Sequence, residues 1–283
     1  MAAFASSLSR FYANKSLFFG LGLLGLILLA SIVGPLLVDA AATRVGATIP
    51  RLPPSPEHWF GTDGQGRDMF ATMVHALPQT LRIGIAAGLI SLSVGVALGL
   101  IAGFVGGIVD TVIRLASDVM MTIPGIAILV LVASNVRVMT VDLMAVIVAA
   151  LSWMIAARTI RAQTLTLRER GYVAIARLNG TSGLKLIFVE VLPNLLPFIA
   201  ASFVVTVTSA MLATIGLEAL GLGPQNDLTL GMTIYWAQFY GAILRGLWWW
   251  WGPPIVLIVL IFVGLLLTSA GMDSFVNKRL ETN

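Results

Sequence analysis

The stretch IGIAAGLISLSVGVALGLIAGFVGGIV, residues 83–109, contains no charged side chain. A transmembrane helix needs about 20 apolar residues, within a range of roughly 17–25. Working outward, five further uncharged stretches occupy residues 17–38, 119–136, 143–157, 191–217 and 246–272. The stretch 143–157 is short, and it crosses a bilayer only if residues 140–142 or 158–160 lie at the interface. We therefore predict an all-α protein with six transmembrane helices.

The composition of the chain points to a lipid environment. Hydrophobic residues make up 58% of the 283 residues, and charged residues make up 11%. Soluble domains carry about 45–50% apolar and about 25% charged residues. The mean hydropathy is +0.96. A water-soluble fold of this length cannot bury so much apolar surface, so we predict a multi-pass integral membrane protein.

The first apolar stretch has some features of a secretory signal, because Lys15 precedes it and three alanines follow it at residues 40–42. The apolar core of a signal peptide is typically about 7–15 residues long. Residues 17–38 exceed that length. We therefore expect this stretch to remain in the protein as its first transmembrane helix.

The distribution of basic residues predicts the orientation in the membrane. With six spans and the N-terminus inside, the inner segments contain Arg10, Lys15, Arg114, Arg158, Arg161, Arg168, Arg170, Arg177, Lys185, Lys278 and Arg279. The outer segments contain the smaller set Arg44, Arg51, Arg67, Arg82, Arg137 and Arg245. Cytoplasmic loops carry an excess of Lys and Arg. Both termini are therefore predicted to be cytoplasmic, and the basic character does not require a nucleic-acid partner.

Several classes of catalytic or ion-coupled protein are disfavoured by the residues present. The chain has no cysteine, and its two histidines fall outside the spans. They are too few for a histidine-built metal centre, and we predict no catalytic residues and no intramembrane enzyme. Ion-coupled carriers usually place ionisable groups among their helices. Here only Asp118 and Glu218 come near lipid depth, so a secondary carrier is the alternative from another class.

The segment 158–190 is basic and is the only predicted inner segment long enough to dock a partner. The chain has three lysines, and none follows the G-x-x-x-x-G run of a phosphate-binding loop. Any ATP hydrolysis must therefore occur in a partner. From these residues alone, a basic loop that only fixes the membrane topology is as good an interpretation as a docking element. The outer segment 39–82 is rich in Pro and Gly, which favours turns and extended chain over helix.

Two further patterns concern packing. Gly95, Gly99, Gly103 and Gly107 recur every four residues, with a separate pair at Gly84 and Gly88. Small residues at this spacing let another helix approach closely, so we predict a packing seam. The four tryptophans at residues 248–251 are typical of an aromatic belt at the membrane interface. We favour this belt over a sugar-stacking site.

Three motifs carry a resemblance to a known family. They are NKSLFFGLGLLGLILLASIVGPLL at 14–37, HWFGTDGQGRDMF at 58–70 and GFVGGIVDTVIRLASDVMMTIP at 103–124. Along almost its whole length the chain resembles the dipeptide/oligopeptide/nickel class of ABC importer permeases, specifically the C-type subunit. The resemblance implies short cytoplasmic coupling helices that dock into a groove of an ATPase.

The cytoplasmic motif of that family is recognisable here, with departures. Ala174 stands where Glu is usual, and Glu190 stands where Ile is usual. Gly180 is expected to form a turn between two helices, and Pro193 is expected to begin the next helix. The residues implied in coupling, within 160–193, are Arg168, Glu169, Arg170, Ala174, Ala176, Arg177, Gly180, Lys185, Leu192 and Pro193.

The outer face contains a second set of candidates. The block GLEALGLGPQNDLTLG at 216–231 resembles an outer segment of the family, although Glu218 replaces a small polar residue and Thr214 stands where Glu is frequent. The candidates for an outer gate or for contact with a binding protein are Gly61, Thr62, Asp63, Gly66, Arg67, Asp68, Glu218, Gly221 and Gly223.

The resemblance implies a subunit of a binding-protein-dependent importer in a prokaryotic inner membrane. The expected partners are a second homologous permease forming a heterodimer, one or two ATPases that hold ATP and Mg²⁺, and an extracytoplasmic solute-binding protein. This chain itself is expected to bind no cofactor. The expected solutes are peptides, with oligosaccharides or a nickel chelate as alternatives. The expected units are residues 1–40 with the first span, the loop 41–80, the five-helix core 81–275 and the tail 276–283.

Overall fold

The computed structural model describes the backbone of residues 14–281, and side chains up to residue 274 with the exception of residue 273. The predictions that concern Arg10, Lys278 and Arg279 lie outside the described side chains. Within the described backbone all regular elements are helical, apart from one isolated bridge between Thr62 and Asp68. The predicted all-helical fold is confirmed for this part of the chain.

Among the described residues, four continuous helices are long and apolar enough to cross a membrane. They are α2 (Lys15–Leu37), α3 (Met69–Val105), the helix formed by α9 (Gly183–Lys185), η2 (Leu186–Val191) and α10 (Leu192–Ala219), and α12 (Trp248–Glu281). Two bent pairs bring the number of spans to six if each pair counts as one. These pairs are α4 (Gly107–Thr122) with α5 (Gly125–Ser134), and α6 (Val141–Ala150) with α7 (Trp153–Arg168).

The stretch 119–136, predicted as one spanning helix, is broken within its length. α4 ends at Thr122, α5 begins at Gly125, and the two axes differ by 80°. Pro124 causes this break, because proline has no N–H to donate and forces the preceding residue out of the helical region. Ile123 accordingly has φ −82° and ψ 131°. The short stretch 143–157 is also broken, by a 46° bend between α6 and α7.

The expectation of turns and extended chain over residues 39–82 holds only as far as residue 68. Asp68 begins α3 by accepting a 2.8 Å hydrogen bond from the Ala71 backbone N–H. This cap lets the helix start 14 residues before the apolar stretch that begins at Ile83. The helix ends at Val105, where Gly106 takes a positive φ of 74°.

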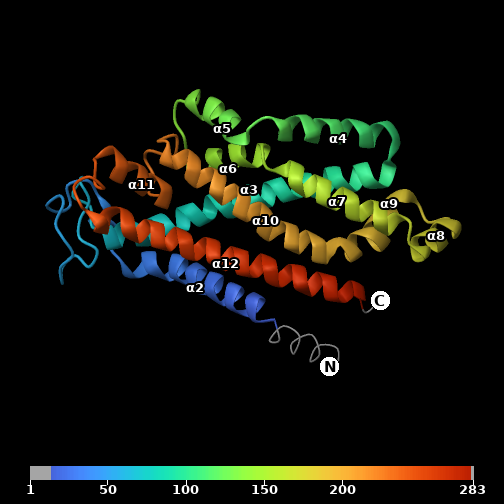
Figure 1. Cartoon of the computed structure of the whole chain (residues 1–283), viewed down its shortest axis with the longest axis horizontal. Coiled ribbons are helices and arrows are strands. Elements are labelled where there is room, and N and C mark those ends of the chain that lie inside the picture. The colour runs from blue at the N-terminus through green and yellow to red at the C-terminus, as the bar shows by residue number, and fades with distance from the viewer. Residues whose placement is uncertain (1–13, 282–283) are drawn as a thin grey trace.

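The helices form an elongated bundle with α3 and α10 at its centre (Figure 1). α2 lies along α12, and α4 with α5 lies along the side opposite α2. The start of α2, the end of α12 and α8 (Gly171–Leu178) lie at one end of the bundle (Figure 1). The other end contains residues 39–68, which include η1 (Ala40–Thr43), and α11 (Leu230–Phe239).

The predicted glycine seam is confirmed along α3, with one exception. Side-chain carbons placed at Gly95, Gly99 and Gly103 would overlap α7, and at Gly84 and Gly88 they would overlap Met211 and Val207 of α10. Close backbone approach therefore holds α3 against both neighbours. Gly107 has open space around it and follows the end of α3, so it does not belong to the seam.

The tryptophans at residues 248–251 do not act as one group. Trp248 is exposed, whereas Trp250 is 1% exposed and stacks on Tyr240 with ring centroids 5.8 Å apart. The belt interpretation is therefore wrong for Trp250, which belongs to the core. Four consecutive positions of a helix point in four directions, so only part of such a run can face the interface.

Candidate functional site

The coupling segment, residues 160–193, contains the end of α7, the short helix α8, a turn, and the start of the helix formed by α9, η2 and α10. α8 ends at Leu178, and Gly180 follows with φ +77°. The Thr181 N–H donates to the Ala176 carbonyl at 3.1 Å, and the Gly180 N–H donates to the Arg177 carbonyl at 3.0 Å. This pattern ends helices at a glycine in the left-handed region. Gly180 forms the turn between helices that the sequence predicts.

α8 has one buried side and one exposed apolar side. Val173 is fully buried and packs with Leu186 of η2. The opposite side exposes Tyr172, Ile175 and Leu178, of which Leu178 is 87% exposed. Apolar side chains gathered on an exposed helix at the end of a bundle are typical of a surface that another protein covers.

The charged residues of the coupling segment divide into two groups. Arg168 donates to the carbonyls of Gly103 and Phe104 at 3.3 and 3.4 Å, so it caps the C-terminal end of α3. It also contacts Glu169 at 3.2 Å. Arg168 is therefore tied to its own bundle. Arg161 is likewise tied to the bundle, through Asp110. Arg170, Arg177 and Lys185 are exposed, as is Ala174 at the position where Glu is usual in the family.

Pro193 lies in the first turn of α10, as the sequence predicts, although α10 continues directly from α9 and η2. The helix that contains Pro193 starts at Gly183, with Ser182 as its N-cap residue. Pro193 cannot donate to the carbonyl four residues earlier. The preceding turn, η2, is a π-helix that ends at Val191, and such wider turns are found where the α-helical pattern is interrupted.

Two ion pairs join α4 to α7. Arg161 donates two hydrogen bonds to the Asp110 carboxylate, one of them 2.6 Å long, and Arg158 pairs with Asp118. Asp118, one of the two acids predicted near lipid depth, therefore has a basic partner.

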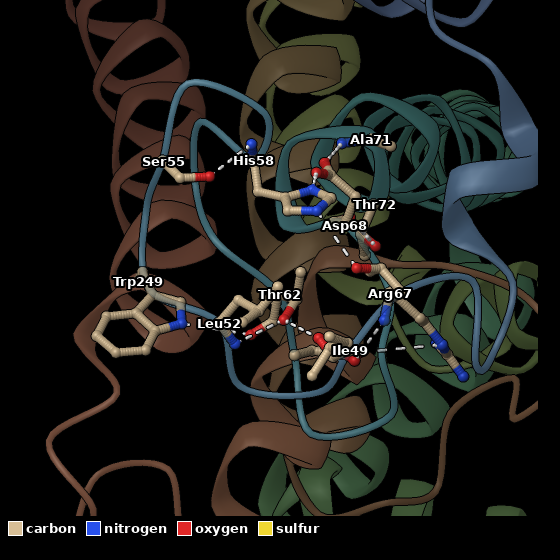
Figure 2. A network of polar contacts seen from close by, with 12 residues as sticks. Ile49, Leu52, Ser55, His58, Thr62, Arg67, Asp68, Ala71, Thr72 and Trp249 are labelled. Atoms are coloured by element: carbon tan, nitrogen blue, oxygen red, sulfur yellow. Dashed lines mark hydrogen bonds and ion pairs between the residues drawn. The ribbon is translucent and has the colours of Figure 1, made fainter.

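The outer block 61–68 folds onto its own loop. Thr62 donates to the Ile49 carbonyl at 2.7 Å and accepts from the Leu52 N–H at 2.8 Å. Asp68, besides capping α3, pairs with His58 at 2.7 Å (Figure 2). Gly61 and Gly66 take positive φ values of 60° and 72°. The polar side chains Thr62 and Asp68 are buried, so they stabilise the loop from inside.

Asp63 is a second acidic residue around which the loop folds. Its carboxylate accepts the backbone N–H groups of Gln65 and Arg67 at 2.7 and 2.9 Å, and the Arg67 guanidinium lies 3.9 Å away. Burial raises the pKa of Asp63 above its usual value, although both backbone bonds act in the opposite direction. Asp63 therefore acts as a buried acceptor that shapes the turn.

The outer loop, residues 39–68, is fixed to α11 and α12. The Trp249 indole N–H donates to the Thr62 carbonyl at 3.3 Å, as drawn in Figure 2. The Gln65 amide donates to the Tyr240 hydroxyl at 3.3 Å. Sequence reasoning missed both contacts, because nothing in the spacing links residue 62 to residue 249. The loop exposes a different set of side chains to a partner, including Ile49, Arg51, Glu57 and Trp59.

The remaining outer candidates lie where α10 meets α11. Gly221 follows the end of α10 with φ +81° and lies against the ring of Tyr235. Glu218 is fully buried, and side-chain carbons at Gly223 or Gly231 would overlap it. The structure therefore brings Glu218, Gly221 and Gly223 together at one hairpin and separates them from the buried residues of the outer loop.

A further cavity lies where the two helix breaks meet α10. It has a volume of about 260 Å³. Its lining includes Ile123 and Gly125 at the first break, Ser152 at the second, and Thr206 and Ser209 of α10. We call it the break pocket. Sequence reasoning did not identify it, because it depends on the two bends.

Two family models match the chain. Residues 95–282 match the binding-protein-dependent transport system inner membrane component. Residues 4–54 match the N-terminal transmembrane domain of oligopeptide transport permease C.

Similar proteins from other organisms give the same result. A peptide permease protein of Brucella abortus is 32% identical over 219 residues, covering 77% of this chain and 72% of the relative. The oligopeptide transport system permease protein OppC of Mycobacterium bovis is 28% identical over 227 residues, covering 80% and 78%. The dipeptide transport system permease protein DppC of Bacillus subtilis is 29% identical over 219 residues, covering 76% and 67%.

These relatives are transport permeases and not enzymes, which supports the main prediction over the carrier and intramembrane-enzyme alternatives. The first family match covers more than half of the chain and includes the coupling segment, the break pocket and the α10–α11 hairpin. The chain therefore belongs to the family of inner membrane components of binding-protein-dependent transport systems, as a C-type permease subunit that spans the membrane several times.

Proposed function

We propose that the chain is one of two homologous permease subunits of an ATP-driven peptide importer. The three relatives are named for peptides, oligopeptides and dipeptides, which favours peptides over oligosaccharides or nickel chelates. The second permease forms a heterodimer with this chain. One or two ATPase subunits hold ATP and Mg²⁺, and an extracytoplasmic binding protein delivers the peptide. This chain contributes the path and the coupling surface, and it binds no cofactor.

Both termini lie on the cytoplasmic side in this proposal, with six spans. The start of α2 and the end of α12 lie at the same end of the bundle as α8 (Figure 1). That end also exposes Arg170, Arg177 and Lys185. Exposed basic side chains favour the cytoplasmic face.

The exposed apolar side of α8 is the observation that carries the coupling role. Leu178 and Ile175 have no cover within the bundle, whereas Val173 anchors the same helix to η2 and the α10 base. We assign the exposed side to a groove of the ATPase. Nucleotide binding that favours one arrangement of the ATPases then moves α8 and, through Arg168, the end of α3.

The break pocket is the proposed position of the peptide path in this subunit. α5 and α6 each contain 10 residues, so each break lies about 15 Å from the outer connection between them. Half of a hydrocarbon core of about 30 Å is the same distance. Non-helical backbone at this depth is tolerated where it is buried in protein or lines a water-filled cavity. The hydroxyls of Ser152 and Ser209 suit a hydrated path.

The decisive experiment uses the absence of cysteine from the natural chain. Leu178→Cys and Leu244→Cys place single thiols on highly exposed side chains, the first on α8 and the second in the turn before α12. In the reconstituted complex we expect only Leu178→Cys to cross-link to an ATPase subunit. Lipid vesicles that contain the reconstituted complex should take up trialanine only when ATP and the binding protein are both present. Uptake driven by an ion gradient without ATPases would instead support a secondary carrier.

A further inference from the structure

Glu218 is a buried acid without a basic partner. It lies in the last turn of α10 and is 0% exposed. Among the side chains that the structure describes, none forms an ion pair with it, and neither carboxylate oxygen has a hydrogen bond of standard geometry. Burying an isolated carboxylate is costly, so its surroundings must offset that cost.

The surroundings of Glu218 belong to the first turn of α11. Side-chain carbons at Gly231 and Gly223 would overlap the Glu218 side chain, so both glycines leave the space that it fills. The nearest hydrogen-bond donors are the Gly231 backbone N–H and the Thr229 hydroxyl. They approach the carboxylate without reaching standard hydrogen-bond geometry. The N-terminal end of a helix is partially positive and favours a carboxylate.

The first turn of α11 has backbone donors that its own helix cannot satisfy. The Leu230 N–H donates to the Thr80 hydroxyl of α3 at 2.9 Å. The Met232 N–H donates to the Thr229 hydroxyl at 3.2 Å. The Gly231 N–H, between them, faces Glu218. The backbone N–H groups of residues 230–232 thus face three different oxygens. These belong to Thr80 of α3, to Glu218 of α10 and to Thr229, the residue that precedes α11.

We propose that Glu218 is a positioning residue that holds the α10–α11 hairpin, residues 216–231, in place at the outer face. α11 continues to Tyr240, whose hydroxyl contacts Gln65 of the outer loop. A displacement of α10 is therefore passed through Glu218 to α11 and on to the outer loop. This proposal rests on the proposed function. It predicts that Glu218 affects the step at which the binding protein docks and delivers its peptide.

Binding-protein-stimulated ATP hydrolysis by the reconstituted complex tests the proposal, with trialanine as the peptide. For Glu218→Ala we expect the half-saturating concentration of binding protein to rise about fivefold or more, the low end of typical coupling between sites. The maximal rate of hydrolysis should stay unchanged. Glu218→Gln should restore much of the loss, because its amide keeps the shape of the side chain and an acceptor oxygen beside the Gly231 N–H.

Gly231→Ala tests the same contact from the other side. Its added carbon needs the space of the carboxylate, so we expect the same rise in half-saturating concentration. The double variant Glu218→Ala with Gly231→Ala should be no worse than Gly231→Ala alone. Gly216→Ala is the matched control, because its added carbon makes only an ordinary 3.6 Å contact with Ile126. Unchanged half-saturation in Glu218→Ala, or independent effects that multiply in the double variant, would overturn the proposal.

A measurement on the full chain in lipid nanodiscs separates this proposal from the importer function. Spin labels on Asn226→Cys and Glu57→Cys, both exposed, report the distance between the hairpin and the outer loop. We expect a narrow distance distribution in the parent and in Glu218→Gln, and a broad one in Glu218→Ala. An equally narrow distribution in Glu218→Ala would overturn the positioning role, whatever the complex transports.

Discussion

The outer loop and the coupling segment both contain glycines in the left-handed region and several charged residues, yet they use their polar groups in opposite ways. The outer loop directs Thr62, Asp63 and Asp68 inward, where each accepts or donates hydrogen bonds within the loop. The coupling segment leaves Arg177 and Lys185 exposed at its surface. A motif rich in polar residues can therefore specify a fold in one place and a partner surface in another.

This difference predicts opposite phenotypes for substitutions in the two regions. Changes within the outer loop should lower the stability of the subunit and affect uptake only through that loss. Changes on the exposed side of the coupling segment should abolish or weaken uptake while the subunit remains inserted and folded.

Gly180→Pro should abolish trialanine uptake. Gly180 has φ +77°, whereas proline fixes φ near −65°, so the turn after α8 cannot form. Membrane insertion should remain intact, because no bundle side chain lies near Gly180. Uptake and the amount of subunit in the membrane are measured together. Gly171→Ala is the matched control at the start of α8, since it also has open space and no positive φ. Uptake at the parent rate in Gly180→Pro would refute the coupling role.

Asp68→Ala should lower the free energy of unfolding by about 1–2 kcal/mol, the typical loss for an N-cap residue. It removes the acceptor for the Ala71 N–H and the partner of His58. Thermal unfolding in detergent measures the loss. Asp39→Ala is the control, because Asp39 caps only the short helix η1 and is exposed. If Asp68→Ala blocked uptake without lowering stability, the loop would have a direct contact role.

The sequence predicts the apolar stretches well because lipid requires long uncharged helices. Residues 17–37 lie within α2, and residues 192–217 lie within α10. It also predicts the turn at Gly180, which depends on local backbone preference. The bend at Pro124 was missed even though proline is a helix breaker, because the run on either side is uniformly apolar. Contacts such as Trp249 with Thr62 join distant parts of the chain, and one sequence contains no signal for them.

The candidate site was predicted less completely than the fold. Arg168 was grouped with the docking charges, but it caps the end of α3. Side-chain direction decides this, and sequence spacing alone does not give it. The sequence marks Glu218 as an acid near lipid depth, as a departure from the family pattern and as an outer candidate, but it does not predict the contact with Gly231. The burial of Glu218 against Gly231 depends on how the α10–α11 hairpin closes.

Arg168→Met tests whether the contact between α7 and α3 only stabilises the subunit or also transmits motion from the ATPase. Its hydrogen bonds to Gly103 and Phe104 are long, so we expect a loss of only about 1 kcal/mol in the free energy of unfolding, below the usual range for bonds to charged groups. Uptake per ATP hydrolysed should fall if the link transmits motion. Arg170→Met is the control, since Arg170 is exposed. Equal coupling ratios in the two variants would assign Arg168 to stability alone.

Asp63→Asn should produce the smallest effect, visible only in the pH dependence of stability. Burial raises the pKa of Asp63, so the folded protein takes up its proton at a higher pH than the unfolded chain, where the value is about 3.8. Between these two pKa values the folded state binds more protons, and stability therefore rises as the pH falls through that window. Asn cannot ionise, so the difference between the parent and Asp63→Asn unfolding curves should shrink as the pH is lowered toward 4. A difference that stays constant over this range would show that Asp63 is ionised at no cost, and that the inward-facing loop tolerates its charge as easily as the coupling segment tolerates Arg177.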